Sequence, residues 1–242
     1  MPRAITDDKK PVSSPQLSRS LIAFAAVPTV IYFIISAMLT YDPTHDFGVR
    51  LLKENGPVEL ASFACMTSAG VLGLILAYRV RSRVTKPVLV GLTLCGLGFF
   101  VIGMEEISWG QQFFEWQTPE VIAKTNAQNE TTFHNHQLFQ EYLEIFAILF
   151  ALAGLIGVAL NRSGVLKDLM PRPIFFWWFV PLLVVASLDL MHEFWIPSYR
   201  FDMLINHLDE VNEMICAMIA LTFVLFKTRE LCGTVKASGT AR

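Results

Sequence analysis

The sequence predicts an all-α fold: a polytopic membrane helix bundle of about six transmembrane helices, with both termini in the cytoplasm. The first observation behind this prediction is a set of six apolar segments in a chain that is 53% hydrophobic. The second is a division of charge between the connections on the two sides. Each segment is long enough to cross a hydrocarbon core of about 30 Å. The segments cover residues 20–40, 60–78, 88–109, 142–161, 174–195 and 208–226.

Charged residues separate onto the two sides of the predicted membrane. Fifteen of the 19 Lys and Arg residues lie in the two tails and in the connections after the second and fourth segments. Basic residues collect on the cytoplasmic side of membrane proteins, which places both termini there. The other side carries 17 of the 21 acids and all five histidines, so its formal charge is −13 against +11 inside. Charges this poorly paired must be solvated, protonated or neutralised by bound cations.

The predicted elements follow in order along the chain. Residues 1–18, rich in Pro, Ser and charge, are expected to form a disordered cytoplasmic tail. No small-residue cleavage site follows the first apolar segment, which is therefore expected to be a retained anchor. Residues 19–229 form one membrane domain, in which Pro181 should kink the fifth segment. Residues 230–242 form a second cytoplasmic tail.

The longest outer connection, residues 110–141, is predicted to be a structured cap. It lacks Gly after Gly110 and contains Pro119, which favours a short helix near residues 119–125 over a slack linker. Just before the fourth segment it offers Glu130 and two histidines separated by one residue, His134 and His136, with Asn126 a few residues earlier. A loop histidine can bind a metal, although solvated loop histidines are the commoner case.

The third apolar segment ends with two adjacent acids, Glu105 and Glu106. Each would cost about 2.5 to 3.5 kcal/mol if it faced lipid, so both are expected to point into the bundle. Trp109, four residues after Glu105, is expected to share its face of the helix.

The fifth segment ends with Asp189, His192 and Glu193, which lie within an arc of about 100° and form one polar stripe. This spacing is typical of helical metal sites. A histidine capped by its own acids at the membrane boundary explains the stripe equally well.

Acids also open the sixth segment, at Asp209, Glu210 and Glu213, with His207 beside them. Asn206 is expected to cap this helix, and acids near a helix N-terminus are favoured by its dipole. Glu213 lies about 6 Å deeper than Asp209, where an isolated carboxylate should be protonated or hold a cation.

One outward-open polar pocket between the third, fifth and sixth segments, roofed by the cap, accounts for all four clusters. Zinc or iron suits a set of imidazole and carboxylate ligands. The other acids would orient a ligand or act as general base. The predicted metal ligands are His134, His192, Glu193, His207 and Glu210; the predicted catalytic acids are Glu105, Glu106 and Asp189.

The stretches EEISWGQ (105–111), TP (118–119), NAQNE (126–130) and HN (134–135) together resemble a motif of bacterial multi-spanning membrane proteins to which no activity is assigned. The resemblance implies that the third-segment acids act as a unit with Trp109, Asn126, Glu130, His134 and Asn135. It also implies a bacterial inner (plasma) membrane, in which the charge division predicts that the active face is periplasmic or extracellular. The other pocket residues are Trp109, Asn126, Glu130, Asn135 and Glu213. The overall design is also similar to alkaline ceramidase-like membrane hydrolases. Unlike that family, this sequence has no His-x-x-x-His in a late segment.

The leading functional prediction is a metal-dependent membrane hydrolase or other lipid-modifying enzyme, whose lipid substrate enters from the outer leaflet. Two other classes stay open. One is a cation- or proton-coupled carrier that uses the buried acids; the other is a subunit or assembly factor that binds a membrane protein partner through the acidic outer face. The basic residues lack the aromatic interleaving of a nucleic-acid surface and are expected to touch membrane lipids.

Overall fold

The computed structural model describes residues 19–53, 55–114, 116–124, 126, 131–132, 143–164, 166–194 and 199–233, without the side chains of Gln112, Leu143, Glu193, Phe194, Tyr199, Arg200 and Asp202. All regular elements in these ranges are helices, and six are long and apolar enough to cross a membrane. The chain is therefore a multi-pass, all-helical membrane protein. The long helices are α1 (Arg19–Thr40), α3 (Pro57–Val80), α4 (Lys86–Glu106), α8 (Leu143–Ser163), α9 (Phe176–Phe194) and α10 (Tyr199–Gly233).

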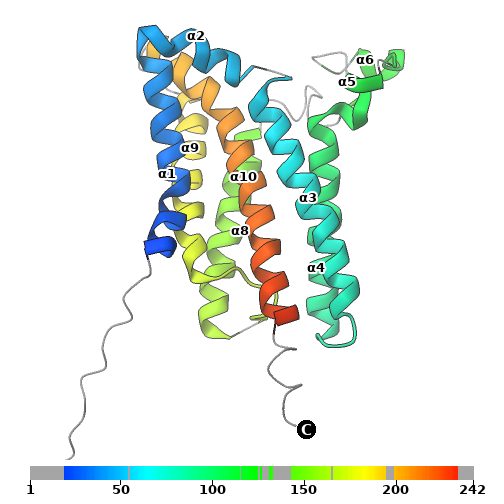
Figure 1. The fold of residues 1–242 in the computed structure, drawn as a ribbon. Helices are drawn as coiled ribbons and strands as arrows, with labels where there is room; N and C mark the ends of the chain where they lie inside the picture. Colours follow the sequence, from blue (N-terminus) through cyan, green and yellow to red (C-terminus); the bar gives the residue numbers. More distant parts are fainter. Residues whose placement is uncertain are drawn as a thin grey trace, which may run out of the picture.

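Shorter helices join the spans. They are α2 (Asp42–Leu51), η1 (Ser108–Gly110), α5 (Gln111–Phe114), α6 (Glu120–Ala123) and η2 (Pro173–Phe175). In Figure 1, α2, α5 and α6 lie at the same end of the bundle, whereas α1 begins and α10 ends at the opposite end. We name the first of these the acidic end: α1, α4 and α9 finish there, and α3, α8 and α10 begin there.

The six predicted spans are confirmed, with two changes at the acidic end. The last helix, α10, begins at Tyr199 rather than at residue 208 and has 35 residues. At 1.5 Å per residue it is about 52 Å long, well beyond a hydrocarbon core of about 30 Å. Asn206 therefore lies inside the helix, and its predicted capping role is wrong. Without that cap, the helix N-terminus no longer explains the acids at Asp209 and Glu210.

The third predicted span ends earlier than expected. α4 stops at Glu106, and Ser108, Trp109 and Gly110 all have positive φ. Left-handed dihedrals cannot continue a right-handed helix, so α4 ends before this turn. The spacing predicted that Trp109 shares the helix face of Glu105, and this prediction is wrong.

The spans pack as two groups that meet at α10. α3 lies along α4 and α10, while α8 lies along α9, which also contacts α1 and α10. Glycines allow the α3–α4 approach: a Cβ at Gly70 would lie 2.5 Å from the backbone nitrogen of Phe100. By contrast, α4 and α8 have almost no contact within the described ranges.

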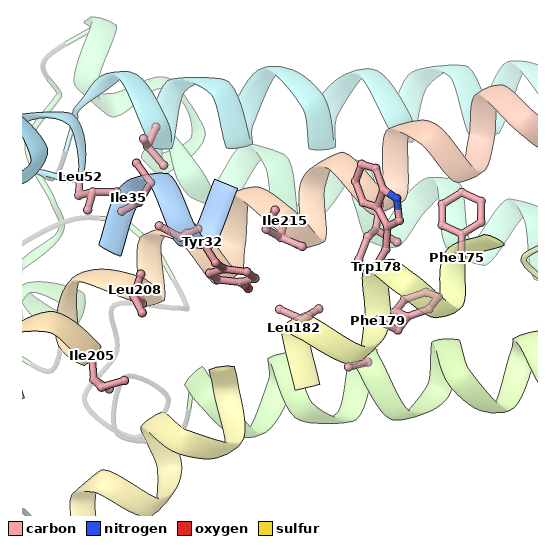
Figure 2. Close-up of a cluster of buried hydrophobic side chains, with 14 of the residues drawn as sticks. Tyr32, Ile35, Leu52, Phe175, Trp178, Phe179, Leu182, Ile205, Leu208 and Ile215 are labelled. Carbon is pink, nitrogen blue, oxygen red and sulfur yellow. The ribbon is translucent and has the colours of Figure 1, made fainter. Parts of the chain in front are cut away.

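The main apolar core is formed chiefly by α1, α9 and α10, and α8 adds Ala151 and Val158. Figure 2 labels side chains of this core, most of which come from α1, α9 and α10. Trp178 and Leu182 come from α9, and Leu208 and Ile215 from α10. The indole nitrogen Nε1 of Trp178 donates a hydrogen bond to the backbone oxygen of Phe24 on α1, at 2.9 Å. A buried indole N–H needs such a partner, so this bond fixes how α1 docks on α9.

At the opposite, basic end, a buried lysine closes the bundle. Lys227 is 1% exposed, and its Nζ lies 2.9 Å from the carbonyl oxygen of Lys167 and 2.9 Å from Oε2 of Glu230. Arg172 also pairs with Glu230. These contacts tie the connection between α8 and α9 to the last turns of α10.

Candidate functional site

Three carboxylates from three helices meet at the acidic end. Glu144 on α8, Asp189 on α9 and Asp209 on α10 each offer an oxygen, and these oxygens all lie within 4.8 Å of one another. Glu144 is 7% and Asp189 4% exposed, while Asp209 is half-buried. We name this group the acidic triad. Carboxylate oxygens gathered in this way are the ligands that hard divalent cations prefer.

The packing of the helices brings the acidic triad together. Glu144 is the second residue of α8, Asp189 lies in the last two turns of α9, and Asp209 lies eleven residues into α10. α9 runs toward the acidic end whereas α8 and α10 run away from it, so three positions far apart in sequence reach a similar depth. α8 packs on α9, and α9 packs on α10, which closes the distances.

His192 flanks the acidic triad. It lies one helical turn after Asp189 and is buried, and its ring centroid is 5.8 Å from that of Phe201 on α10. Phe201 belongs to the early turns of α10 that the sequence did not predict. Asp189 and His192, two members of the polar stripe expected on the fifth span, thus face α10. The side chain of the third member, Glu193, lies outside the described residues.

A cavity of about 500 Å³ lies beside the acidic triad. Asp209 belongs to both, because it lines the cavity as well as forming the triad. The volume is within the range of about 300 to 1,000 Å³ that is typical of small-molecule sites. Its polar lining comes from Glu105, Glu106, Asp209, Asn212 and Glu213. The rest is mainly apolar and comes from α3, α4, α8 and α10.

Asn212 is a buried polar group in the cavity wall. It is 2% exposed, and its Oδ1 accepts a hydrogen bond from the Tyr32 hydroxyl of α1 at 2.7 Å. Its amide nitrogen Nδ2 has no hydrogen-bond partner among the described residues. A buried donor left without an acceptor costs about 1 to 3 kcal/mol. A ligand that accepts a hydrogen bond would remove this cost.

A second set of acids surrounds Glu213. Glu106 of α4 and Glu210 of α10 act on Glu213 electrostatically, as does Glu59 from the first turn of α3. Glu106 and Glu213 line the cavity. Carboxyl groups from α3, α4 and α10 therefore lie close to one another on this side of the cavity.

The segment after α4 holds Glu105 in place. The indole Nε1 of Trp109 donates to Oε1 of Glu105, and this contact is possible because the left-handed turn folds the indole back over the helix end. Glu105 is itself buried. The predicted association of Glu105 with Trp109 is thus present, but it is a hydrogen bond across a turn rather than a shared helix face.

The described part of the predicted cap is held by its own amides. Gln111 donates to the hydroxyl of Thr118 at 2.8 Å and accepts from the backbone nitrogen of Thr131 at 2.7 Å. The amide of buried Asn126 donates to the carbonyl oxygen of Thr132 at 3.1 Å. The short helix expected near residues 119–125 is α6. Asn126 therefore ties the loop to itself, and its place in a pocket stays a prediction.

The cavity contains several residues predicted for an outward pocket, whereas the acidic triad differs from the predicted ligand set. Glu105, Glu106 and Glu213 line the cavity. The nitrogen Nδ1 of His207 lies 2.7 Å from the carbonyl oxygen of Met203 on its own helix, and the acidic triad contains neither His207 nor Glu210. Their roles as ligands stay predictions. The predicted site residues His134, Glu130 and Asn135 lie outside the described residues.

Sequence reasoning missed Glu144, and it placed Asp209 in the acidic cluster of the sixth segment without predicting it as a ligand. The signal for Glu144 was present, since this acid stands inside the apolar run LEIFAILF. An acid at the start of a span is usually explained by its place at the membrane boundary. Only the position of Glu144 opposite Asp189 and Asp209 distinguishes it from such acids.

Comparison of the chain with protein-family models, with curated proteins and with solved structures finds no match. Only the residues of the site therefore indicate a function.

Proposed function

We propose that the protein is a metal-dependent membrane enzyme, a hydrolase or related lipid-modifying enzyme whose substrate lies in the cavity beside the acidic triad. The observation that carries this proposal is the position of Asp209. This residue contributes an oxygen to a group of three carboxylates suited to a cation, and it also lines a cavity of about 500 Å³. A cation held by Glu144, Asp189 and Asp209 would therefore lie next to a bound substrate.

The ligand chemistry favours particular metals. Three carboxylates form an oxygen-only set, which suits Mn²⁺, Mg²⁺ or Ca²⁺. Zinc or iron, the metals suggested by the histidines, would need a nitrogen ligand as well. His192 is the nearest described source of one on α9, since it lies one turn from Asp189 and is buried.

The cavity supplies the other groups that hydrolysis needs. A bound metal would act as a Lewis acid and lower the pKa of a water molecule. Glu105 and Glu106 line the same cavity on α4, across from the α8 wall, so either could take a proton from water. Trp109 would hold Glu105 in one orientation through its indole N–H. Asn212 would donate a hydrogen bond to a substrate oxygen.

The arrangement gives less support to the carrier. A transported ion needs sites along the whole span, and the acidic triad and the cavity acids all lie toward the acidic end. Glu230, an acid near the basic end, is engaged by Lys227 and Arg172.

Metal content and activity together test the proposal. Detergent-purified protein should contain near-stoichiometric metal by elemental analysis, or take up added Mn²⁺, Mg²⁺ or Zn²⁺, and the Asp189→Asn and Asp209→Asn variants should lose it. Asp46→Asn is the matched control, because Asp46 is an exposed acid of α2 at the same end of the bundle.

Activity is then followed by mass spectrometry of lipid products in vesicles of phosphatidylethanolamine and phosphatidylglycerol, with and without chelator. Protein that binds none of these metals would refute the proposal. So would a lipid-modifying activity that survives both the chelator and the two substitutions.

A further inference from the structure

We propose that the cavity takes the hydrocarbon chain of an acyl lipid from the leaflet at the acidic end, which enters between α4 and α8. The lipid's carbonyl oxygen then accepts a hydrogen bond from Nδ2 of Asn212, which is buried and must turn toward the cavity to reach the lipid. The assignment of an acyl lipid as the substrate rests on the proposed function. Occupation of the cavity by a lipid chain, in contrast, does not require the metal.

The dimensions of the cavity match one lipid leaflet. Along α4 its lining runs from Cys95 to Glu106, which is twelve residues or about 16 Å of helix. Half of a hydrocarbon core of about 30 Å is about 15 Å. The cavity thus begins at the acidic end and stops near the middle of the membrane, as a single acyl chain of that leaflet does.

The cavity is polar at one end only. Its polar side chains belong to the acidic end, whereas Cys95, Phe99 and Phe150 line the deeper part. A soluble polar substrate would leave these apolar walls unmatched, and a plain hydrocarbon would leave the amide of Asn212 without an acceptor. An acyl lipid satisfies both parts, because its chain is apolar and its carbonyl accepts hydrogen bonds.

The route of entry follows from the packing. α4 lies along α3 and α8 lies along α9, so little closes the space between α4 and α8. Ile102 on α4 and Phe146 on α8 both line the cavity, and they are 49% and 52% exposed. Other large apolar side chains are exposed beside them, such as Leu97 and Leu149. The opening therefore faces the lipid-covered surface of the bundle rather than water.

Gly98 gives a direct test. It lines the cavity, and a Cβ built on it meets nothing within 4 Å, so a large side chain there would fill the cavity without displacing a helix. Gly98→Trp is the blocking variant. Leu97→Trp is the matched control, because Leu97 is the neighbouring residue of α4 and is exposed without being part of the cavity lining.

The probe is a phosphatidylcholine with a diazirine in an ester-linked palmitoyl chain, diluted into vesicles of phosphatidylethanolamine and phosphatidylglycerol. After reconstitution and irradiation, peptide mass spectrometry locates the adducts. We expect adducts on Phe99 and Phe150 in wild type and in Leu97→Trp, and their loss in Gly98→Trp. An ether-linked probe of the same chain length should label these residues more weakly, because it lacks the carbonyl that Asn212 would bind.

Adducts on Phe99 and Phe150 that persist in folded Gly98→Trp would overturn the proposal, as would adducts confined to outward residues such as Leu149. Equal labelling by the ether-linked probe would overturn the assignment of the carbonyl to Asn212. If Gly98→Trp does not fold, Ala147→Leu fills the cavity from α8, since Ala147 also lines it.

Asp189→Asn separates this proposal from the metal site. Asp189 is not part of the cavity lining, so this variant should lose metal and keep the adducts. Adducts without metal in wild type would refute the metal site alone, while metal without adducts would refute the lipid chain alone.

Discussion

Replacing Asp189 by Asn should make the metal-free protein more stable and abolish its stabilisation by metal. The substitution keeps the shape of the side chain and removes one negative charge. Two unit charges 4.8 Å apart repel by about 3.5 kcal/mol at an effective dielectric constant of about 20. Asp189 takes part in two of the three pairs, so with all three groups charged its removal relieves about 7 kcal/mol of repulsion at this separation. The measured gain will be a fraction of this, because solvent and counter-ions already relieve part of the repulsion.

Metal binding should stabilise the folded state of the wild type. A cation at 100 times its Kd stabilises the folded state by about 2.7 kcal/mol through mass action. The wild type should therefore unfold at a higher temperature in Mn²⁺ than in chelator, and Asp189→Asn should unfold at one temperature in both. Intrinsic tryptophan fluorescence during heating in detergent measures both effects, with Asp46→Asn as the control that should behave as wild type.

Two results would refute this reasoning. An Asp189→Asn variant that keeps the full metal-dependent shift would mean that the metal binds elsewhere. A variant that is less stable than wild type in chelator would mean that Asp189 is stabilised by its surroundings rather than repelled by the acidic triad.

Three further predictions concern the scaffold and the turn after α4. Gly70→Ala should lower stability by about 1 to 3 kcal/mol in detergent unfolding, because its Cβ would press on the Phe100 backbone at 2.5 Å, whereas Gly98→Ala should change stability little. Lys227→Met should lower stability by about 2 to 3 kcal/mol, since it removes a buried charged donor from the Lys167 carbonyl and from Glu230. Arg229→Met, at an exposed position, is its control, and equal stability of the two variants would contradict the prediction. Trp109→Phe should lower lipid-modifying activity about 10-fold or more and leave metal content unchanged, because Glu105 loses the group that orients it; unchanged activity would show that this orientation does not matter.

Most of the fold follows from local properties of the chain. Apolar segments of sufficient length and the distribution of Arg and Lys predict the six spans, because the membrane requires each span to satisfy its backbone internally. The ends of the spans are less predictable. α10 extends to Tyr199 because the polar stretch before residue 208 continues as helix outside the hydrocarbon core, where hydropathy no longer marks it. α4 stops before Trp109 because of a left-handed turn that hydropathy does not encode.

The site shows a similar division. The sequence by itself determined that acids collect at one end of a membrane bundle, and that Glu105, Glu106, Asp189 and Glu213 lie there. Only the tertiary structure decided which of them meet. Glu144, Asp189 and Asp209 stand on three separate helices, and their distances depend on the packing of α8 on α9 and of α9 on α10. Helical periodicity fixes which residues share a face within one helix, but it carries no information about which face of another helix lies opposite.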